Sequence, residues 1–139
     1  MNRLNPHISV DCVIFGFDAK QLKVLLIERE QLPNEDKSIP SGLYKLPGNL
    51  ISDTEDLDNS AYRILKELTG VDNIFLKQFS VFANPNRLNN PNDLIWLRDT
   101  SNLPVERVLT VAYYSLVKIS SPTKSLLANS HWIPVKGMP

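Results

Sequence analysis

Residues 47–71, PGNLISDTEDLDNSAYRILKELTGV, carry the side chains of this chain that are best suited to chemistry. Carboxylates recur through the stretch, and one arginine, Arg63, lies between Glu55 and Glu67 in the sequence. Carboxylate oxygens are the hard ligands that Mg2+ takes. The stretch is therefore the first place to look for a binding or catalytic site.

The same stretch predicts the helix that positions these side chains. Its apolar residues recur at helical spacing, at Leu57, Ala61, Ile64, Leu65 and Leu68. This spacing predicts a helix over residues 56–68 with a single apolar stripe. We expect Thr54 or Glu55 to cap its start, because the helix dipole favours acidic residues in the first turn. We expect Gly70 to end it.

This loop and helix resemble the Nudix box, whose pattern is G-x5-E-x7-R-E-U-x-E-E-x-G-U, with U a bulky aliphatic residue. The pattern's first glycine falls on Asn49, and the later matches are Glu55, Arg63, Leu65, Glu67, Gly70 and Val71. Residues 44–48, YKLPG, resemble the W-x-(L/F)-P-G segment that precedes the box. The retained spacing favours a Nudix box over an amphipathic helix of no particular family.

The box departs from the pattern at the residues that hold metal. In the Nudix hydrolases that it resembles, three glutamates bind divalent metal, and here Ile64 and Leu68 stand at two of those positions. Glu67 alone is retained, so it is the one candidate metal ligand of that set. The resemblance implies a degenerate box with no catalytic residues and no cofactor. Changing both Ile64 and Leu68 to Glu should raise the affinity for Mg2+ if the folded helix tolerates it.

The alternative is an active Mg2+-dependent Nudix hydrolase of nucleoside-diphosphate derivatives such as ADP-ribose. It would use Glu67 with carboxylates outside the pattern's metal set, namely Asp53, Glu55, Asp99 or Glu106. A third possibility, from another class, is a purely structural dimerisation module.

Composition narrows the class of protein. The chain has 139 residues, 42% of them hydrophobic, which is enough for one compact domain. Fifteen basic and fifteen acidic residues give no net charge, which argues against a domain whose main surface binds nucleic acid. The single cysteine, Cys12, excludes an internal disulfide and is expected to be buried. Without a secretory leader or an apolar run of about 18 residues, we expect a cytoplasmic location and no membrane contact.

Strand patterns surround the box. They cover residues 8–17, 22–29, 42–46, 73–83 and 107–119, with a turn predicted at residues 18–21. Residues 30–41 and 84–106 are expected to be loops, and the tail 125–139 a short helix followed by a strand that includes Trp132. Asp11 is an acid within the first strand, either a ligand anchor or a structural acid. The resemblance implies the α+β Nudix fold, a mixed β-sheet sandwiched between helices.

A second resemblance indicates which group of Nudix proteins the sequence is most similar to in pattern. Arg98-Asp99, followed by residues 106–114, ERVLTVAYY, resembles the R-D-P-R-x-R-x-(V/I)-(S/T)-V-A-Y-(Y/L) segment of ADP-ribose-type Nudix enzymes and Nudix-related transcriptional regulators. Together with VDCVIFGF (10–17) and LKELTG (65–70), it favours the regulators, in which a Nudix-like sensor precedes a winged-helix DNA-binding domain. The resemblance covers residues 8–136 of a single domain, 1–139. It implies a homodimer that contacts DNA only through a C-terminal domain absent from these residues.

These resemblances predict a non-catalytic effector-binding domain of a transcriptional regulator. Its effector would be a sugar, a sugar phosphate or an ADP-ribose-like nucleotide. The expected ligand-binding residues are Lys45, Asn49 and Glu67 on one side of the cleft and Arg98 and Arg107 on the other. Arginine suits such a ligand because its planar donors bind phosphate or sugar hydroxyls in pairs. Residues 94–97, LIWL, are the first candidates for the dimer interface.

Overall fold

The computed structural model describes residues 3–28, 43–83, 108–119 and 126–136. The elements, in chain order, are β1 (Leu4–Phe17), β2 (Leu22–Glu28), β3 (Tyr44–Lys45), β4 (Gly48–Ser52), α1 (Leu57–Thr69), β5 (Lys77–Phe82), β6 (Leu109–Lys118) and β7 (Ser130–Pro134). All seven strands belong to one sheet. Among the described residues no helix is long and apolar enough to cross a membrane.

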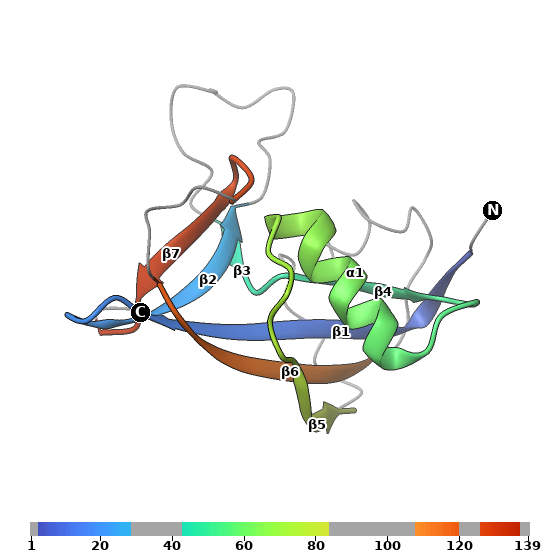
Figure 1. Cartoon of the computed structure of the whole chain (residues 1–139). Coiled ribbons are helices and arrows are strands. Elements are labelled where there is room, and N and C mark those ends of the chain that lie inside the picture. Colours follow the sequence, from blue (N-terminus) through green and yellow to red (C-terminus); the bar gives the residue numbers. More distant parts are fainter. Residues whose placement is uncertain (1–2, 29–42, 84–107, 120–125, 137–139) are drawn as a thin grey trace.

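The long strand β1 is the centre of this sheet. On one side β1 pairs antiparallel with β4 through its first half and with β2 through its second half, and on the other side it pairs parallel with β6. The strand order runs β3-β2-β1-β6-β5, with β7 paired to β2. Parallel and antiparallel pairs together make the sheet mixed, and Figure 1 shows β5 at the end of it beyond β6. The predicted α+β class and mixed sheet are confirmed.

The core lies between the sheet and α1, which packs on β1 and β4 (Figure 1). Its buried members are Val10, Cys12, Ile14, Leu25, Ala61, Ile64, Leu65, Leu76, Val111 and Tyr113. Val10, Cys12 and Ile14 alternate along β1, so one face of that strand points to the helix. The predicted apolar stripe of the helix is confirmed, with Leu57 and Leu68 packed against the core at its margin. Cys12 is buried, as expected, and its burial raises the pKa of the thiol to about 12.

The ends of α1 differ in how well the sequence predicts them. Gly70 ends the helix in the left-handed conformation, with φ 83°, and its N–H donates to the carbonyl of Lys66. The N-cap is Asp56, and neither Thr54 nor Glu55, so that prediction was wrong. The Asp56 carboxylate accepts from the backbone N–H of Asn59 at 2.8 Å. Glu55 cannot fill this role because its carboxylate binds Arg63 instead.

Other expectations are corrected in detail. β1 begins at Leu4 rather than at residue 8, and β5 is confined to Lys77–Phe82. Asp18 closes the predicted turn before β2 by accepting from the N–H groups of Lys20 and Gln21. In the described part of the tail, residues 126–136, a turn precedes β7 and the expected short helix is not found. One helix is described, on one face of the sheet, so the expected second helical layer is not seen in the described residues.

Candidate functional site

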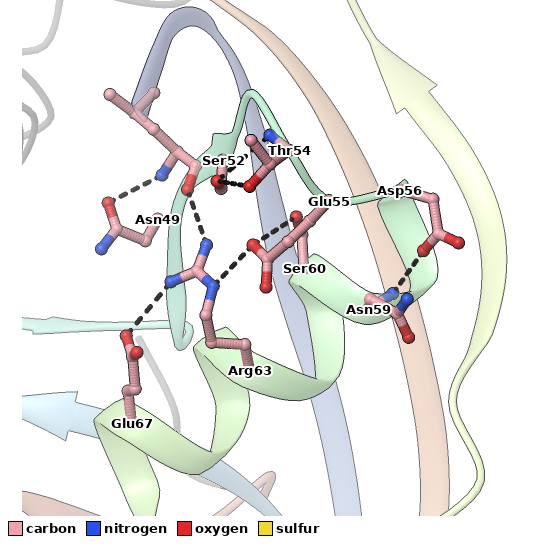
Figure 2. A network of polar contacts seen from close by, with 10 residues as sticks. Asn49, Ser52, Thr54, Glu55, Asp56, Asn59, Ser60, Arg63 and Glu67 are labelled. Atoms are coloured by element: carbon pink, nitrogen blue, oxygen red, sulfur yellow. Dashed lines mark hydrogen bonds and ion pairs between the residues drawn. The ribbon is translucent and has the colours of Figure 1, made fainter. Parts of the chain in front are cut away.

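The segment that joins β4 to α1 gathers the charged side chains of the box around Arg63 (Figure 2). The Nε of Arg63 donates to Oε1 of Glu55 at 2.7 Å, and its Nη1 donates to Oε2 of Glu67 at 3.1 Å. A longer contact of 3.5 Å joins its Nη2 to the carbonyl of Leu50, in β4. One guanidinium therefore connects the loop, the helix and the strand.

The two carboxylates on Arg63 are held very differently. The Glu55 side chain is 19% exposed and also accepts from the hydroxyl of Ser60, which is fully buried. Glu67 lies one helical turn after Arg63, and its side chain is 57% exposed. Exposed pairs of this i, i+4 kind contribute little stability and break easily. Glu55 is thus held firmly beside Arg63, whereas the contact of Glu67 with Arg63 can break easily.

Ile64 and Leu68 have no polar role in this arrangement. Ile64 is completely buried in the core, and Leu68 is partly buried against it. The same turn of the helix therefore points Arg63 and Glu67 toward the loop and Ile64 into the sheet. Aliphatic groups at these positions increase the area that α1 buries, and they offer no lone pair to a cation.

The charged groups at the box do not fit a Mg2+ ion as they are placed. Mg2+ takes near-octahedral oxygen ligands and is commonly bound through one or two carboxylates with waters. Here both carboxylates accept from Arg63, so an ion would have to replace a guanidinium already held at 2.7 Å. In the described parts of the chain, no group of three His, Cys, Asp or Glu side chains is arranged to hold a metal ion.

Three of the five predicted ligand-binding residues fall within the described residues. Lys45 lies in β3, paired with Ile27, and Glu67 lies on α1. The Asn49 side chain accepts from the N–H of Leu50 at 2.7 Å, and Figure 2 shows it beside β4, near Arg63. Asn49 thus has a local structural bond in addition to its predicted role. The roles of all three residues in binding stay predictions.

The remaining predicted residues lie outside the described residues. They are Arg98 and Arg107, the carboxylates of Asp99 and Glu106, and the segment 94–97. Arg63, the centre of the observed network, was matched to the box but was not among the expected binding residues. The signal for its role is its spacing from Glu67, because residues four apart on a helix are neighbours.

Asp11 lies in β1, where this strand pairs with the beginning of β4. It is in register with Gly48, and a Cβ built on Gly48 would come within 2.0 Å of the Asp11 carboxylate oxygen. Glycine at this position therefore leaves the space that the carboxylate occupies. Asp11 forms an interaction within the protein, which supports the structural alternative for this acid.

A second polar contact joins the beginning of α1 to the sheet. The Tyr113 hydroxyl, from β6, donates to Oδ1 of Asp58 at 2.6 Å. Tyr113 is buried in the core, and burial together with the Asp58 carboxylate raises the pKa of its phenol. This bond fixes the first turn of α1, and hence the loop that carries Glu55, over the sheet.

Known proteins with the same arrangement identify the fold. No family model matches the chain. It is 27% identical over 136 residues to the ADPR responsive transcriptional repressor NtrR of Acinetobacter baylyi, covering 95% of this chain and 46% of that protein. The chain thus spans about half the length of this curated relative.

Two solved structures of NrtR are also similar to this chain. The NUDIX domain of Shewanella oneidensis NrtR, crystallised with ADP ribose, superposes with a TM-score of 0.63 at 27% identity, over 92% of this chain and 72% of that one. NrtR of the same organism in complex with a 27mer DNA gives a TM-score of 0.64 at 28% identity, over 95% of this chain and 54% of that one.

These similarities, with the mixed sheet and the helix that carries the box, show that the chain has the Nudix fold. Among proteins of this fold, it is similar to the Nudix domain of NrtR, a transcriptional regulator.

Proposed function

We propose that this chain is an effector-binding domain of a transcriptional regulator, and that it binds an ADP-ribose-like nucleotide without hydrolysing it. The main support for the proposal is that the charged side chains of the box bind one another. Arg63 holds both box carboxylates, and Ile64 is buried where the Nudix pattern places a metal-binding glutamate. Without an ion to stabilise the developing charge, most of the rate of diphosphate cleavage is lost.

The class of effector is inferred from the relatives. One is named as responsive to ADPR, and the NUDIX domain of another was crystallised with ADP ribose. The box network itself carries one positive and two negative charges. A diphosphate would therefore need cations from outside this network. Lys45, Arg98 and Arg107 are the residues that we propose supply them, while Asn49 and Glu67 bind sugar hydroxyls.

The competing hydrolase would need the same carboxylates for a metal ion. Glu67 is exposed enough to leave Arg63, but Glu55 is bound by Arg63 and Ser60 together. Of the other carboxylates considered, Asp53 is exposed in the loop before α1, and Asp99 and Glu106 lie outside the described residues. The donor set at the box therefore favours binding over hydrolysis.

The proposal is tested by measuring binding and turnover on the same sample. Calorimetry with ADP-ribose, and with AMP and ribose 5-phosphate for comparison, should show binding of ADP-ribose in the absence of Mg2+. Incubation of ADP-ribose with the protein and Mg2+ should leave the nucleotide intact. Mg2+-dependent cleavage that is lost in Glu67→Gln and kept in the surface control Asp72→Asn would establish the hydrolase instead. Asp72 is a suitable control because it lies after the helix, paired with Lys66.

The partners of the whole protein are also proposals. The relative that matches this chain over 46% of its own length is a transcriptional repressor, and a solved NrtR was crystallised with DNA. We propose that DNA is contacted by a C-terminal domain outside these 139 residues and that the intact protein is a homodimer, since paired half-sites suit a two-fold symmetric protein. In a gel-shift experiment the 139-residue chain alone should show no sequence-dependent binding.

A further inference from the structure

The last turn of α1 is bonded to residues 127–130, which lead into β7 and which we call the β7 entry segment. The Ser130 hydroxyl donates to the carbonyl of Leu68 at 3.0 Å, and the N–H of Leu127 donates to the carbonyl of Thr69, also at 3.0 Å. Carbonyls in the last turn of a helix have no partner within the helix, so other groups must supply one. This end of α1 lies beside the beginning of β7 (Figure 1), and the entry segment supplies those partners.

The β7 entry segment is also bonded to the end of β2. The N–H of Glu28 donates to the carbonyl of Asn129 at 2.8 Å, and Ser130 is in register with Ile27. On its other side, Ile27 is in register with Lys45 of β3. Residues directly opposite in neighbouring strands share a face, so these three form a row on the face that carries α1. The two ends of the row are about 10 Å apart, because neighbouring strands lie about 4.8 Å apart.

Two residues of the proposed effector site lie on either side of Ser130. Glu67 directly precedes Leu68 in α1, and Lys45 is at the far end of the row. Ser130 is bonded to the helix through its hydroxyl and to β2 through the strand pairing. Its hydroxyl is buried, so its removal would leave the Leu68 carbonyl without this donor and the last turn of α1 less firmly held.

We propose that Ser130 is a positioning residue of the effector site. Its bond to the last turn of α1 sets the separation between Glu67 and Lys45, and thereby couples effector binding to the placement of β7. This inference rests on the proposed function, because it requires both residues to contact the effector. Coupling is reciprocal, so a ligand that draws Glu67 and Lys45 together must also change how β7 lies.

Trp132 lies where such a change can be detected. It is two residues after Ser130, so it is on the same face of β7, and it packs against the core. A Cβ built on Gly16 would come within 2.7 Å of the Trp132 ring, so the indole lies directly on β1. A shift of β7 would therefore alter the surroundings of this indole.

Calorimetry with ADP-ribose tests the positioning role with three serine variants. Ser130→Ala should lower the affinity roughly fivefold or more, which is the lower end of ordinary coupling between two sites. Ser130→Thr keeps a hydroxyl and should recover most of the affinity. Ser115→Ala is the matched control, because Ser115 is 7% exposed against 5% for Ser130 and lies in β6, on the other side of β1 from β2. It should bind ADP-ribose as the wild type does.

Fluorescence tests the coupling to β7. Trp96 is the other tryptophan of the chain, so the measurement uses a Trp96→Phe background in which emission comes from Trp132. ADP-ribose should shift this emission with the half-saturation found by calorimetry, and at saturation the shift should be smaller in Ser130→Ala. Circular dichroism should show all variants folded. If Ser130→Ala does not fold, Ser130→Cys replaces it, because a thiol has a similar size and is only a weak donor.

The outcomes separate this inference from the proposed function. A wild type that does not bind ADP-ribose would refute the proposed function and this inference with it. Binding that Ser130→Ala weakens no more than Ser115→Ala would refute the inference alone, and would show that Ser130 only caps the helix. An emission of Trp132 that saturating ADP-ribose leaves unchanged would likewise refute the coupling to β7 while leaving effector binding intact.

Discussion

Replacing Ile64 with glutamate restores a residue of the Nudix pattern, and we expect it to destabilise the fold. The Ile64 side chain is fully buried among the residues that join α1 to the sheet. Removing a buried aliphatic side chain costs about 2–4 kcal/mol. A carboxylate at the same place must also be desolvated without a partner, which adds roughly 1–3 kcal/mol. We therefore expect Ile64→Glu to lower the free energy of unfolding by about 4 kcal/mol or more, against roughly 5–15 kcal/mol for a typical domain.

Urea unfolding followed by circular dichroism measures this loss, with two variants as controls. Leu68 is only partly buried, so Leu68→Glu should cost about 1 kcal/mol. Ile64→Gln has the shape of the glutamate variant without its ionisable group. Burial should raise the pKa of the introduced carboxyl above its unfolded value of about 4.3. The gap in stability between Ile64→Glu and Ile64→Gln should then be small below that pH and should widen as the pH rises.

Millimolar Mg2+ provides the decisive comparison. If the double variant Ile64→Glu, Leu68→Glu formed the metal site of the pattern, Mg2+ would raise the melting temperature of this variant relative to the same variant without Mg2+, and by more than it shifts the wild type. The sequence alone predicts such a rise, but with the position of Ile64 known we expect none, because a side chain at position 64 points into the core. An Ile64→Glu protein within about 1 kcal/mol of the wild type would refute this reasoning.

Three further predictions concern other contacts. Arg63→Met should lower the free energy of unfolding by about 1–2 kcal/mol, a value already reduced for the partial exposure of Arg63. Glu67→Gln should lower it by less than about 0.5 kcal/mol. Equal losses for the two variants in urea unfolding would contradict the unequal roles of the two carboxylates. Tyr113→Phe should cost about 1–2 kcal/mol. Because the pKa of Tyr113 is raised in the folded state, its hydroxyl contributes to the free energy of unfolding below about pH 10, and this contribution is lost as the pH rises further. The difference in melting temperature between wild type and Tyr113→Phe should therefore become smaller at alkaline pH. Arg107→Ala should weaken ADP-ribose binding by ~1–3 kcal/mol in calorimetry with little effect on the fold, and unchanged affinity would show that Arg107 is not in the cleft.

The elements around the box were predictable because their signals are local. The helical stripe depends only on residues three and four apart, and Gly70 ends the helix because a left-handed residue is needed there. The strands follow from β-branched and aromatic runs, and the spacing of the box was enough to indicate the Nudix fold. The N-cap was missed because Thr54 and Asp56 are both favoured N-cap residue types, and the acidic Glu55 beside them suits a helix N-terminus. What separates them is that Glu55 is drawn to Arg63, eight residues later.

What the sequence determined by itself is therefore the order of the elements, the helix with its apolar stripe, and the absence of two carboxylates from the box. The tertiary structure decided which polar groups meet. The bond of Arg63 to Glu55, the bond from Tyr113 to Asp58, and the space that Gly48 leaves for Asp11 all join residues that only folding brings together. The edge-to-face contact of Phe79 with Tyr114 likewise depends on a bulge in β5, and strand alternation alone cannot locate a bulge.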